Sequence, residues 1–118
     1  MSKFGEHIKA LREAKKEKNK AFSIRKLAER MKISHVFLSQ VEAGTHPSLP
    51  SEKIILKLAE ELGEDPDVLL ALAGRVSESL QEVIVKRPKL FGALIRQLKD
   101  APDHAILRVV REVRDGDW

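Results

Sequence analysis

Cysteine is absent from this chain of 118 residues, and aromatic residues make up only 4% of it. The absence of cysteine excludes a disulfide framework, a thiolate metal site and a cysteine nucleophile, and it suits a reducing compartment. Because aromatics are few, the core must consist mainly of Leu, Ile, Val and Ala, which favours packed helices. No apolar run approaches the roughly 20 residues that cross a bilayer, and no apolar signal segment is seen. We therefore expect a soluble cytoplasmic protein that does not enter a membrane.

The motifs of common enzyme families are also missing. The sequence contains no glycine-rich phosphate loop, no nucleophile elbow and no HExxH motif. The four histidines are scattered, and no two of them have the spacing of metal ligands; they are His7, His35, His46 and His104. The carboxylates fall on helical faces that we expect to be solvated, where general acid-base catalysis has no supporting groups. We expect no catalytic residue, no metal and no cofactor.

Positive charge is concentrated in the N-terminal part of the chain. Residues 1–50 contain 11 Lys and Arg against 5 Glu, whereas residues 51–118 contain 11 Lys and Arg against 13 Asp and Glu. A basic excess attracts phosphates, because each neutralised phosphate releases condensed counterions. Lysine-rich helices are, however, commonly no more than solvated faces. Charge alone therefore indicates only where a polyanionic partner would bind.

Apolar residues recur at helical spacing along nearly the whole chain, and no sustained alternating run typical of a half-buried strand is present. This pattern predicts an all-α fold with seven or eight helices. We expect the boundary between two parts at Gly74: a five-helix domain, residues 1–74, and a C-terminal region of two or three helices, residues 75–118. The five helices are expected at about residues 4–18, 24–31, 35–43, 52–62 and 66–73.

The segment from Ser23 to Gly44 predicts two short helices joined by a tight turn. Ser23 and Ser34 are suitable N-cap residues, and Gly44 stands where a helix end tolerates left-handed geometry. The apolar positions that can lock the two helices together are Leu27, Ala28, Ile33, Leu38 and Val41. The free face of the second helix carries few charges and several hydrogen-bonding groups, which suits insertion into a DNA major groove.

Several points of one known pattern occur together between residues 4 and 74. They are Leu27-Ala28, Ile33-Ser34, Leu38-Ser39, Val41-Glu42, Gly44, Pro50-Ser51 and the run from Leu58-Ala59 to Leu62-Gly63. By this pattern the chain resembles the lambda Cro and repressor-like helix-turn-helix family, also called the xenobiotic response element family of bacterial and phage regulators. The resemblance implies a repressor-like five-helix domain and a transcriptional regulator that binds specific sequences of double-stranded DNA.

The resemblance also implies which side chains contact DNA. It places four base readers at the start of the recognition helix: His35, Val36, Ser39 and Gln40. A glutamine amide can pair bidentately with adenine, a contact worth about 1 to 3 kcal/mol of discrimination, so Gln40 is the leading candidate. The candidates for the DNA backbone are Ser23, Arg25, Lys26, Ser34, Thr45 and His46. The alternative for this second group is that its members are only caps or solvated side chains.

Arg12 and Glu42 stand where the family often pairs the first helix with the end of the recognition helix, so we expect a structural ion pair. Two positions depart from the family: Ile24 replaces a common Gln that contacts the DNA backbone, and Met31 stands where glycine is common at the turn. An insertion at residues 15–21 lengthens the connection between the first two helices. Its basic residues either add reach to flanking phosphates or form a flexible solvated loop.

The C-terminal third presents more apolar side chains than its short helices can bury alone. We expect residues 75–118 to pack against the fifth helix and to build a homodimer interface, because two-fold symmetric operators favour dimeric readers. The interface residues we expect are Leu80, Val83, Ile84, Phe91, Leu94, Ile95 and Val110. The alternative is an intramolecular extension of the core.

Two functions therefore remain open for the chain. In the first, it is a repressor that binds an inverted repeat as a homodimer. In the second, it acts mainly through a protein partner bound by the C-terminal helices, as an antitoxin or as a repressor that a partner protease removes. The two can overlap in one protein.

Overall fold

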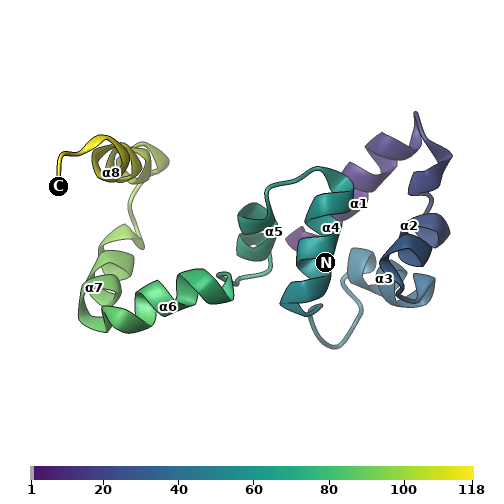
Figure 1. The fold of residues 1–118 in the computed structure, drawn as a ribbon, viewed down its shortest axis with the longest axis horizontal. Coiled ribbons are helices and arrows are strands. Elements are labelled where there is room, and N and C mark those ends of the chain that lie inside the picture. The colour runs from purple at the N-terminus through teal and green to yellow at the C-terminus, as the bar shows by residue number, and fades with distance from the viewer. Residues whose placement is uncertain (1) are drawn as a thin grey trace. The chain divides into compact units, whose positions relative to one another are not determined.

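The structure is a computed structural model that describes residues 2–118. These residues form eight α-helices, one short 3-10 helix and no strand, which confirms the expected all-α fold (Figure 1). The chain divides into two compact units, one that ends at Ser77 and one that runs from Glu78 to Trp118. The division falls three residues after Gly74, where the sequence places the boundary.

The first unit contains five α-helices and the 3-10 helix. Their bounds are α1 (Lys3–Lys16), η1 (Lys20–Phe22), α2 (Ile24–Met31), α3 (His35–Ala43), α4 (Glu52–Leu62) and α5 (Pro66–Leu72). The α-helices begin and end within two residues of the expected ranges. The segment before α2 is more regular than a flexible loop, because residues Lys20–Phe22 form η1 and the Asn19 side chain accepts a hydrogen bond from the Ala21 N–H at 2.9 Å.

Short polar side chains begin the helices of the first unit, as the sequence predicts. Each N-cap accepts a hydrogen bond from a backbone N–H of the first turn and satisfies a donor that has no partner within the helix. The caps are Ser23 for α2, Ser34 for α3, Ser51 for α4 and Asp65 for α5. Helix α3 ends at Gly44, whose φ of 71° is a left-handed conformation that glycine adopts without a steric penalty.

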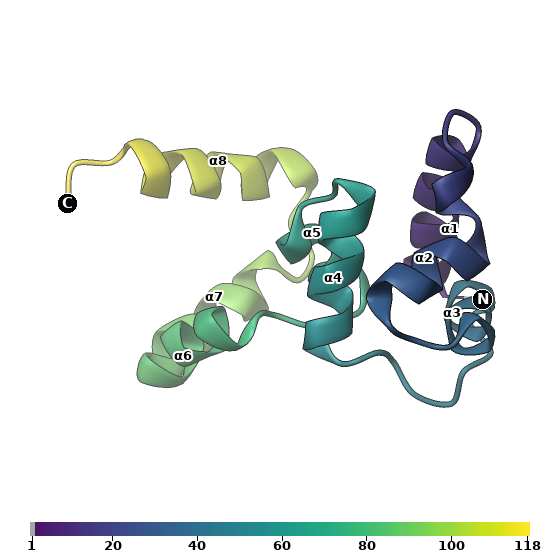
Figure 2. The ribbon, with the colours of Figure 1, turned by 45° about the vertical axis from the view of Figure 1, so that its right-hand side comes forward.

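A single apolar core holds the five α-helices of the first unit together. Its buried residues are Phe4, Ile8, Leu27, Ala28, Met31, Leu38, Val41, Ile55, Leu58, Ala59, Leu62, Leu69 and Leu70. Burial of each large side chain in such a core stabilises the fold by about 1.5 to 3 kcal/mol. Figures 1 and 2 show α2 and α3 joined by a short turn, with α1 and α4 beside them. The core therefore holds α2 and α3 in place against the other helices of the first unit.

The turn between α2 and α3 forms although Met31 stands where glycine is common in the family. Met31 is the last residue of α2 and is buried, whereas the left-handed position belongs to Lys32, with a φ of 58°. A non-glycine residue in this conformation is strained by about 1 to 2 kcal/mol. The backbone N–H of Ile33 donates to the carbonyl oxygen of Ala28 at 3.0 Å and holds the turn closed. The turn thus needs no glycine at residue 31.

The second unit contains α6 (Glu78–Lys86), α7 (Pro88–Leu98) and α8 (Asp103–Asp115). None of these three helices contains a buried residue. Large apolar side chains that are more than a third exposed are Leu80, Val83, Val85, Leu90, Leu94, Ile95, Ile106, Leu107, Val110 and Val113. The unit therefore consists of amphipathic helices whose apolar faces are open to solvent in the isolated chain.

Candidate nucleic-acid interface

Helix α3 has one buried and one exposed face. Leu38 and Val41 belong to the core, whereas the four residues expected to read bases are exposed. These four occupy positions i, i+1, i+4 and i+5, which lie on one side of an α-helix; they are His35, Val36, Ser39 and Gln40. The structure therefore brings them together as one hydrogen-bonding surface without Lys, Arg, Asp or Glu, with an apolar side chain at Val36, which is 53% exposed.

The N-terminal ends of α2 and α3 are electrostatically suited to phosphate. Neither helix carries an acidic residue in its first turn, so the partial positive charge of each helix end is not compensated by its own side chains. At α3 the Ser34 hydroxyl accepts hydrogen bonds from the N–H groups of Val36 at 3.1 Å and Phe37 at 3.3 Å. At α2 the Ser23 hydroxyl accepts from the N–H of Lys26 at 3.3 Å.

A shallow hollow joins α2 to the start of α3. Arg25, Ser34 and His35 line it, together with the acidic side chain of Glu29. Arg25 and Lys26 are both exposed. The structure therefore places an expected backbone contact, Arg25, next to an expected base reader, His35, at one end of the recognition surface.

The loop after α3 is held close to the other end of that surface. A second hollow is lined by Gln40, His46 and the residues up to Pro50. The His46 ring meets the Phe37 ring edge to face, with 4.8 Å between centroids, and its Nδ1 lies 2.8 Å from the Ser48 carbonyl oxygen and 3.2 Å from the Ser48 backbone nitrogen. Thr45 donates its N–H to the carbonyl oxygen of Gln40 at 3.0 Å. The loop is thus attached to α3 rather than free.

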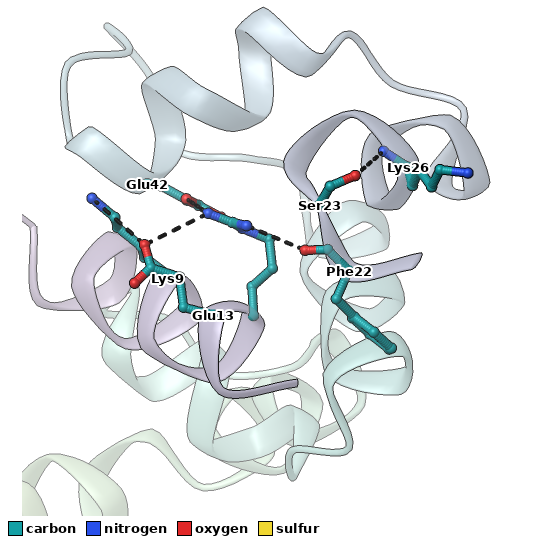
Figure 3. A network of polar contacts seen from close by, with 7 residues as sticks. Lys9, Glu13, Phe22, Ser23, Lys26 and Glu42 are labelled. Carbon is teal, nitrogen blue, oxygen red and sulfur yellow. Dashed lines mark hydrogen bonds and ion pairs between the residues drawn. The ribbon is translucent and has the colours of Figure 1, made fainter. Parts of the chain in front are cut away.

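A buried ion pair fixes the C-terminal end of α3 to α1. Arg12 donates from Nε to Glu42 Oε2 at 2.7 Å and from Nη2 to Glu42 Oε1 at 3.0 Å, and its Nη1 donates to the carbonyl oxygen of Phe22 at 3.2 Å (Figure 3). The two side chains are only 7% and 5% exposed. The hydrogen bonds to Glu42 raise the pKa of Arg12 further above its usual range. Because one guanidinium joins α3 to α1 and to the residue before Ser23, the pair aligns both helices of the motif.

Gly5 is a positioning residue that the sequence reasoning missed. A Cβ at this position would lie 2.5 Å from the carbonyl oxygens of both Val41 and Glu42, so only glycine allows α1 to approach the last turn of α3 this closely. A signal was present: a glycine inside a helical pattern costs about 1 kcal/mol relative to alanine, which points to close packing. Phe37, which supports His46, was likewise not singled out.

Among residues 2–118, no group of three His, Cys, Asp or Glu side chains is placed to hold a metal ion. Within the same residues, no helix is both long enough and apolar enough to span a membrane. Two helices across a tight turn, with an exposed face on the second and open N-terminal ends on both, define a helix-turn-helix protein.

Comparison with known proteins gives the family. A family model described as a helix-turn-helix domain matches residues 6–75, more than half of the chain. The chain therefore belongs to the helix-turn-helix family, in its Cro and repressor-like branch, and is a DNA-binding regulator. Members of this family are typically not enzymes. No curated protein and no solved structure matches the chain.

Proposed function

We propose that the protein is a transcriptional repressor that binds an inverted-repeat operator as a homodimer and reads its sequence with α3. The observation that carries the proposal is the exposed face of α3, which combines Gln40 with three further polar or apolar contacts on a helix anchored by the core and by the Arg12–Glu42 pair. A rigid helix with a free, weakly charged face suits the major groove, where each base pair presents its own donors and acceptors.

The dimensions of α3 fit this role. Its 9 residues span about 13.5 Å at 1.5 Å per residue, close to the roughly 12 Å width of the major groove. Contacts at its two ends would then meet the two backbones that border the groove. The proposed contacts at the first end are Ser23, Arg25, Lys26 and Ser34, and those at the second end are Thr45 and His46.

The homodimer in this proposal is supported by the apolar faces of α6, α7 and α8. Ile95 is 57% exposed and Val110 is 50% exposed, and no residue of the three helices is buried. Burying a Val, Leu or Ile side chain in an interface stabilises it by about 1.5 to 3 kcal/mol. A second copy of the chain supplies the same faces and provides the two-fold axis that an inverted repeat requires.

Selection of bound duplexes from random-sequence DNA tests the proposal. We expect enrichment of an inverted repeat whose half-sites are separated by about one helical turn or a multiple of it. The same experiment reports the half-site sequence, which identifies the bases that α3 reads. If no sequence is enriched at any salt concentration, the proposal of sequence-specific binding is wrong.

Two variants separate base reading from phosphate binding. Gln40→Ala is expected to weaken binding to the selected operator by about 1 to 3 kcal/mol and to leave binding to a scrambled duplex unchanged. Lys26→Gln is expected to weaken binding to both duplexes similarly and to reduce the slope of log K against log salt by about 0.9 per protomer, or about 1.8 for a bound dimer. Titrations of both duplexes by fluorescence anisotropy over a salt series measure these effects. If Gln40→Ala loses the same affinity for both duplexes, Gln40 does not read a base.

A second candidate is regulation through a protein partner that binds the C-terminal helices. The partner would be a toxin, if the chain is an antitoxin, or a protease that removes the chain, if it is a repressor. The same exposed apolar faces of α6, α7 and α8 favour it. Light scattering distinguishes the candidates, because a chain that stays monomeric at micromolar concentration leaves those faces to a different protein. A toxin or metallopeptidase encoded next to this chain would support the second candidate.

A further inference from the structure

The segment between α1 and α2 is an ordered structure with a basic outer surface. After α1 ends at Lys16, the backbone N–H of Asn19 donates to the carbonyl oxygen of Lys15 at 3.0 Å. The N–H of Phe22 then donates to the Asn19 oxygen at 3.1 Å, and that of Ser23 to the Lys20 oxygen at 3.1 Å. The segment is therefore a chain of consecutive turns that leads into the N-cap of α2.

Side chains from three helices anchor this segment. Arg12 of α1 donates to the carbonyl oxygen of Phe22, and Arg30 of α2 donates to that of Ala21. The Phe22 ring lies beneath the Arg30 guanidinium, 4.9 Å away, and beneath the Lys15 ammonium, 5.4 Å away. Arg30 is held in turn by Glu61 of α4 at 3.0 Å. These contacts favour the ordered alternative over a flexible solvated loop.

Three exposed lysines lie on this segment and on the end of α1 that precedes it: Lys16, the last residue of α1, Lys18 and Lys20. All three are exposed, and no ion pair joins any of them to an acidic side chain in the described part of the chain. Glu17 is the one acidic residue among them. Lys20 lies three residues before Ser23, the N-cap of α2 and a proposed contact of the DNA backbone, so this basic segment leads into that end of α2.

We propose that Lys16, Lys18 and Lys20 form a phosphate clamp that binds the DNA backbone outside the half-site read by α3. The inference rests on the proposed function, since it assigns the flanking contact of the same interface. Because the backbone that carries the three ammonium groups is already ordered, binding has to order only the lysine side chains, and less of the counterion-release free energy is spent on ordering than in a flexible loop. The clamp adds affinity that is independent of base sequence and lengthens the DNA needed for full binding.

The test compares the full-length protein with the triple variant Lys16→Gln/Lys18→Gln/Lys20→Gln. The matched control is Lys86→Gln/Lys89→Gln/Lys99→Gln, which removes the same charge from exposed lysines of the second unit. Binding to the selected operator duplex and to a scrambled duplex is measured over a salt series, and circular dichroism checks folding. We expect the clamp variant to lose about 0.9 of salt slope per contact, which is about 2 to 3 per protomer and about twice that for a bound dimer, on both duplexes. The control variant should keep the wild-type slope.

Phosphate ethylation interference gives the second readout. We expect ethylation of phosphates outside the α3 half-site to interfere with binding of the wild-type protein and to have no effect on binding of the clamp variant. A clamp variant with the wild-type salt slope and the wild-type interference pattern overturns the inference and leaves the repressor proposal intact. If the wild type selects no sequence, the repressor proposal is wrong. The salt slopes of the wild type and the clamp variant on the scrambled duplex then still test whether the three lysines bind phosphate. Equal slope losses in both variants would attribute the effect to net charge and also overturn the clamp.

Discussion

At the scale of single residues, the recognition helix depends on a position that carries no side chain. Gly5 lets the first turn of α1 approach the carbonyl oxygens of Val41 and Glu42, at the end of α3. Protein cores respond to even one added methyl group when the surrounding backbone cannot move. The orientation of α3 is therefore sensitive to a residue that takes no part in DNA contact.

Gly5→Ala is expected to lower the free energy of unfolding by about 1 to 3 kcal/mol, because the new methyl group meets backbone rather than a flexible side chain. Operator affinity should fall with it, since α3 must shift. Urea unfolding and operator titration measure the two effects. Gly92→Ala in α7 is the control: a Cβ there meets nothing within 4 Å, so it should be neutral or stabilising by up to about 1 kcal/mol. A Gly5→Ala protein as stable as wild type would contradict the tight packing.

The pH dependence of stability has a specific contributor at Glu64. A hydrogen bond from His7 Nε2 to Glu64 Oε2 at 2.9 Å, and another from the Asp65 N–H, hold the pKa of Glu64 below its ordinary value. The folded protein therefore binds fewer protons than the unfolded chain between the two pKa values. The resulting stabilisation is present above the ordinary glutamate pKa and is lost as pH falls through the lower folded pKa.

Glu64→Gln should remove this part of the acid sensitivity. We expect the variant to be less stable than wild type at neutral pH and the difference to shrink as pH falls below the folded pKa of Glu64. Thermal unfolding over a pH series measures it. Glu60→Gln, at an exposed α4 position without an ion pair among the described residues, serves as the control and should keep the wild-type profile. A pH-independent difference between Glu64→Gln and wild type would refute the assignment.

At the scale of elements, α1 and α3 are coupled by polar as well as apolar contacts. The Arg12–Glu42 pair is bidentate and nearly fully buried, and the third guanidinium contact reaches the carbonyl oxygen before Ser23. A buried pair adds little net stability relative to apolar residues, because both charges lose their hydration. Its contribution is to define which part of α3 faces α1, and hence which face remains for DNA.

Removal of either partner should be costly. Arg12→Met or Glu42→Leu is expected to reduce the free energy of unfolding by about 3 to 5 kcal/mol, because each leaves an uncompensated buried charge. The double variant should be more stable than either single variant yet bind the operator more weakly than wild type. Lys9→Met breaks an exposed pair with Glu13 on the same helix and should change stability by less than about 0.5 kcal/mol. Denaturant unfolding of the wild type, the two single variants at Arg12 and Glu42 and the double variant completes a double-mutant cycle. If the losses in free energy of unfolding are additive, the two charges do not interact.

At the scale of the whole molecule, the two units differ in how they use apolar residues. The first unit buries them in one core, whereas the helices of the second unit leave theirs exposed. Large exposed apolar surfaces of that kind favour association with another protein surface, as the proposed dimer requires. Self-association through it would also double the number of DNA contacts, which is why the proposed dimer and the proposed operator symmetry stand together.

Charged substitutions in the apolar faces test the dimer. Ile95→Asp and Val110→Asp are each expected to convert a dimer into a monomer, because an interface does not tolerate an unpaired buried charge. Val85→Asp is the control: Val85 is 74% exposed but lies off the side of α6 shared by Leu80, Val83 and Ile84. Light scattering gives the mass, and operator titration should show a parallel loss of affinity. A dimer that survives both substitutions would exclude these faces as its interface.

The sequence indicates much of the fold because its signals are local. Apolar spacing, serine caps and Gly44 mark helices whose ends differ from the structure by no more than two residues. The exposed residues of α3 follow from the same periodicity, since the residues that do not face the core must face outward. The sequence left alternatives open where the deciding contact comes from elsewhere in the chain, as in the segment before Ser23, where Arg12 and Arg30 donate to the carbonyl oxygens of Phe22 and Ala21.

By itself, then, the sequence determined the helices, the motif and the family, because each depends on neighbours a few residues apart. Only the tertiary structure decided that Gly5 sets the distance between α1 and α3, that Lys32 takes the left-handed turn position, and that three lysines stand on an anchored segment beside α2. The physical reason is that close approach, backbone strain and anchoring are fixed by contacts between segments distant in sequence. Local propensity carries no information about those contacts.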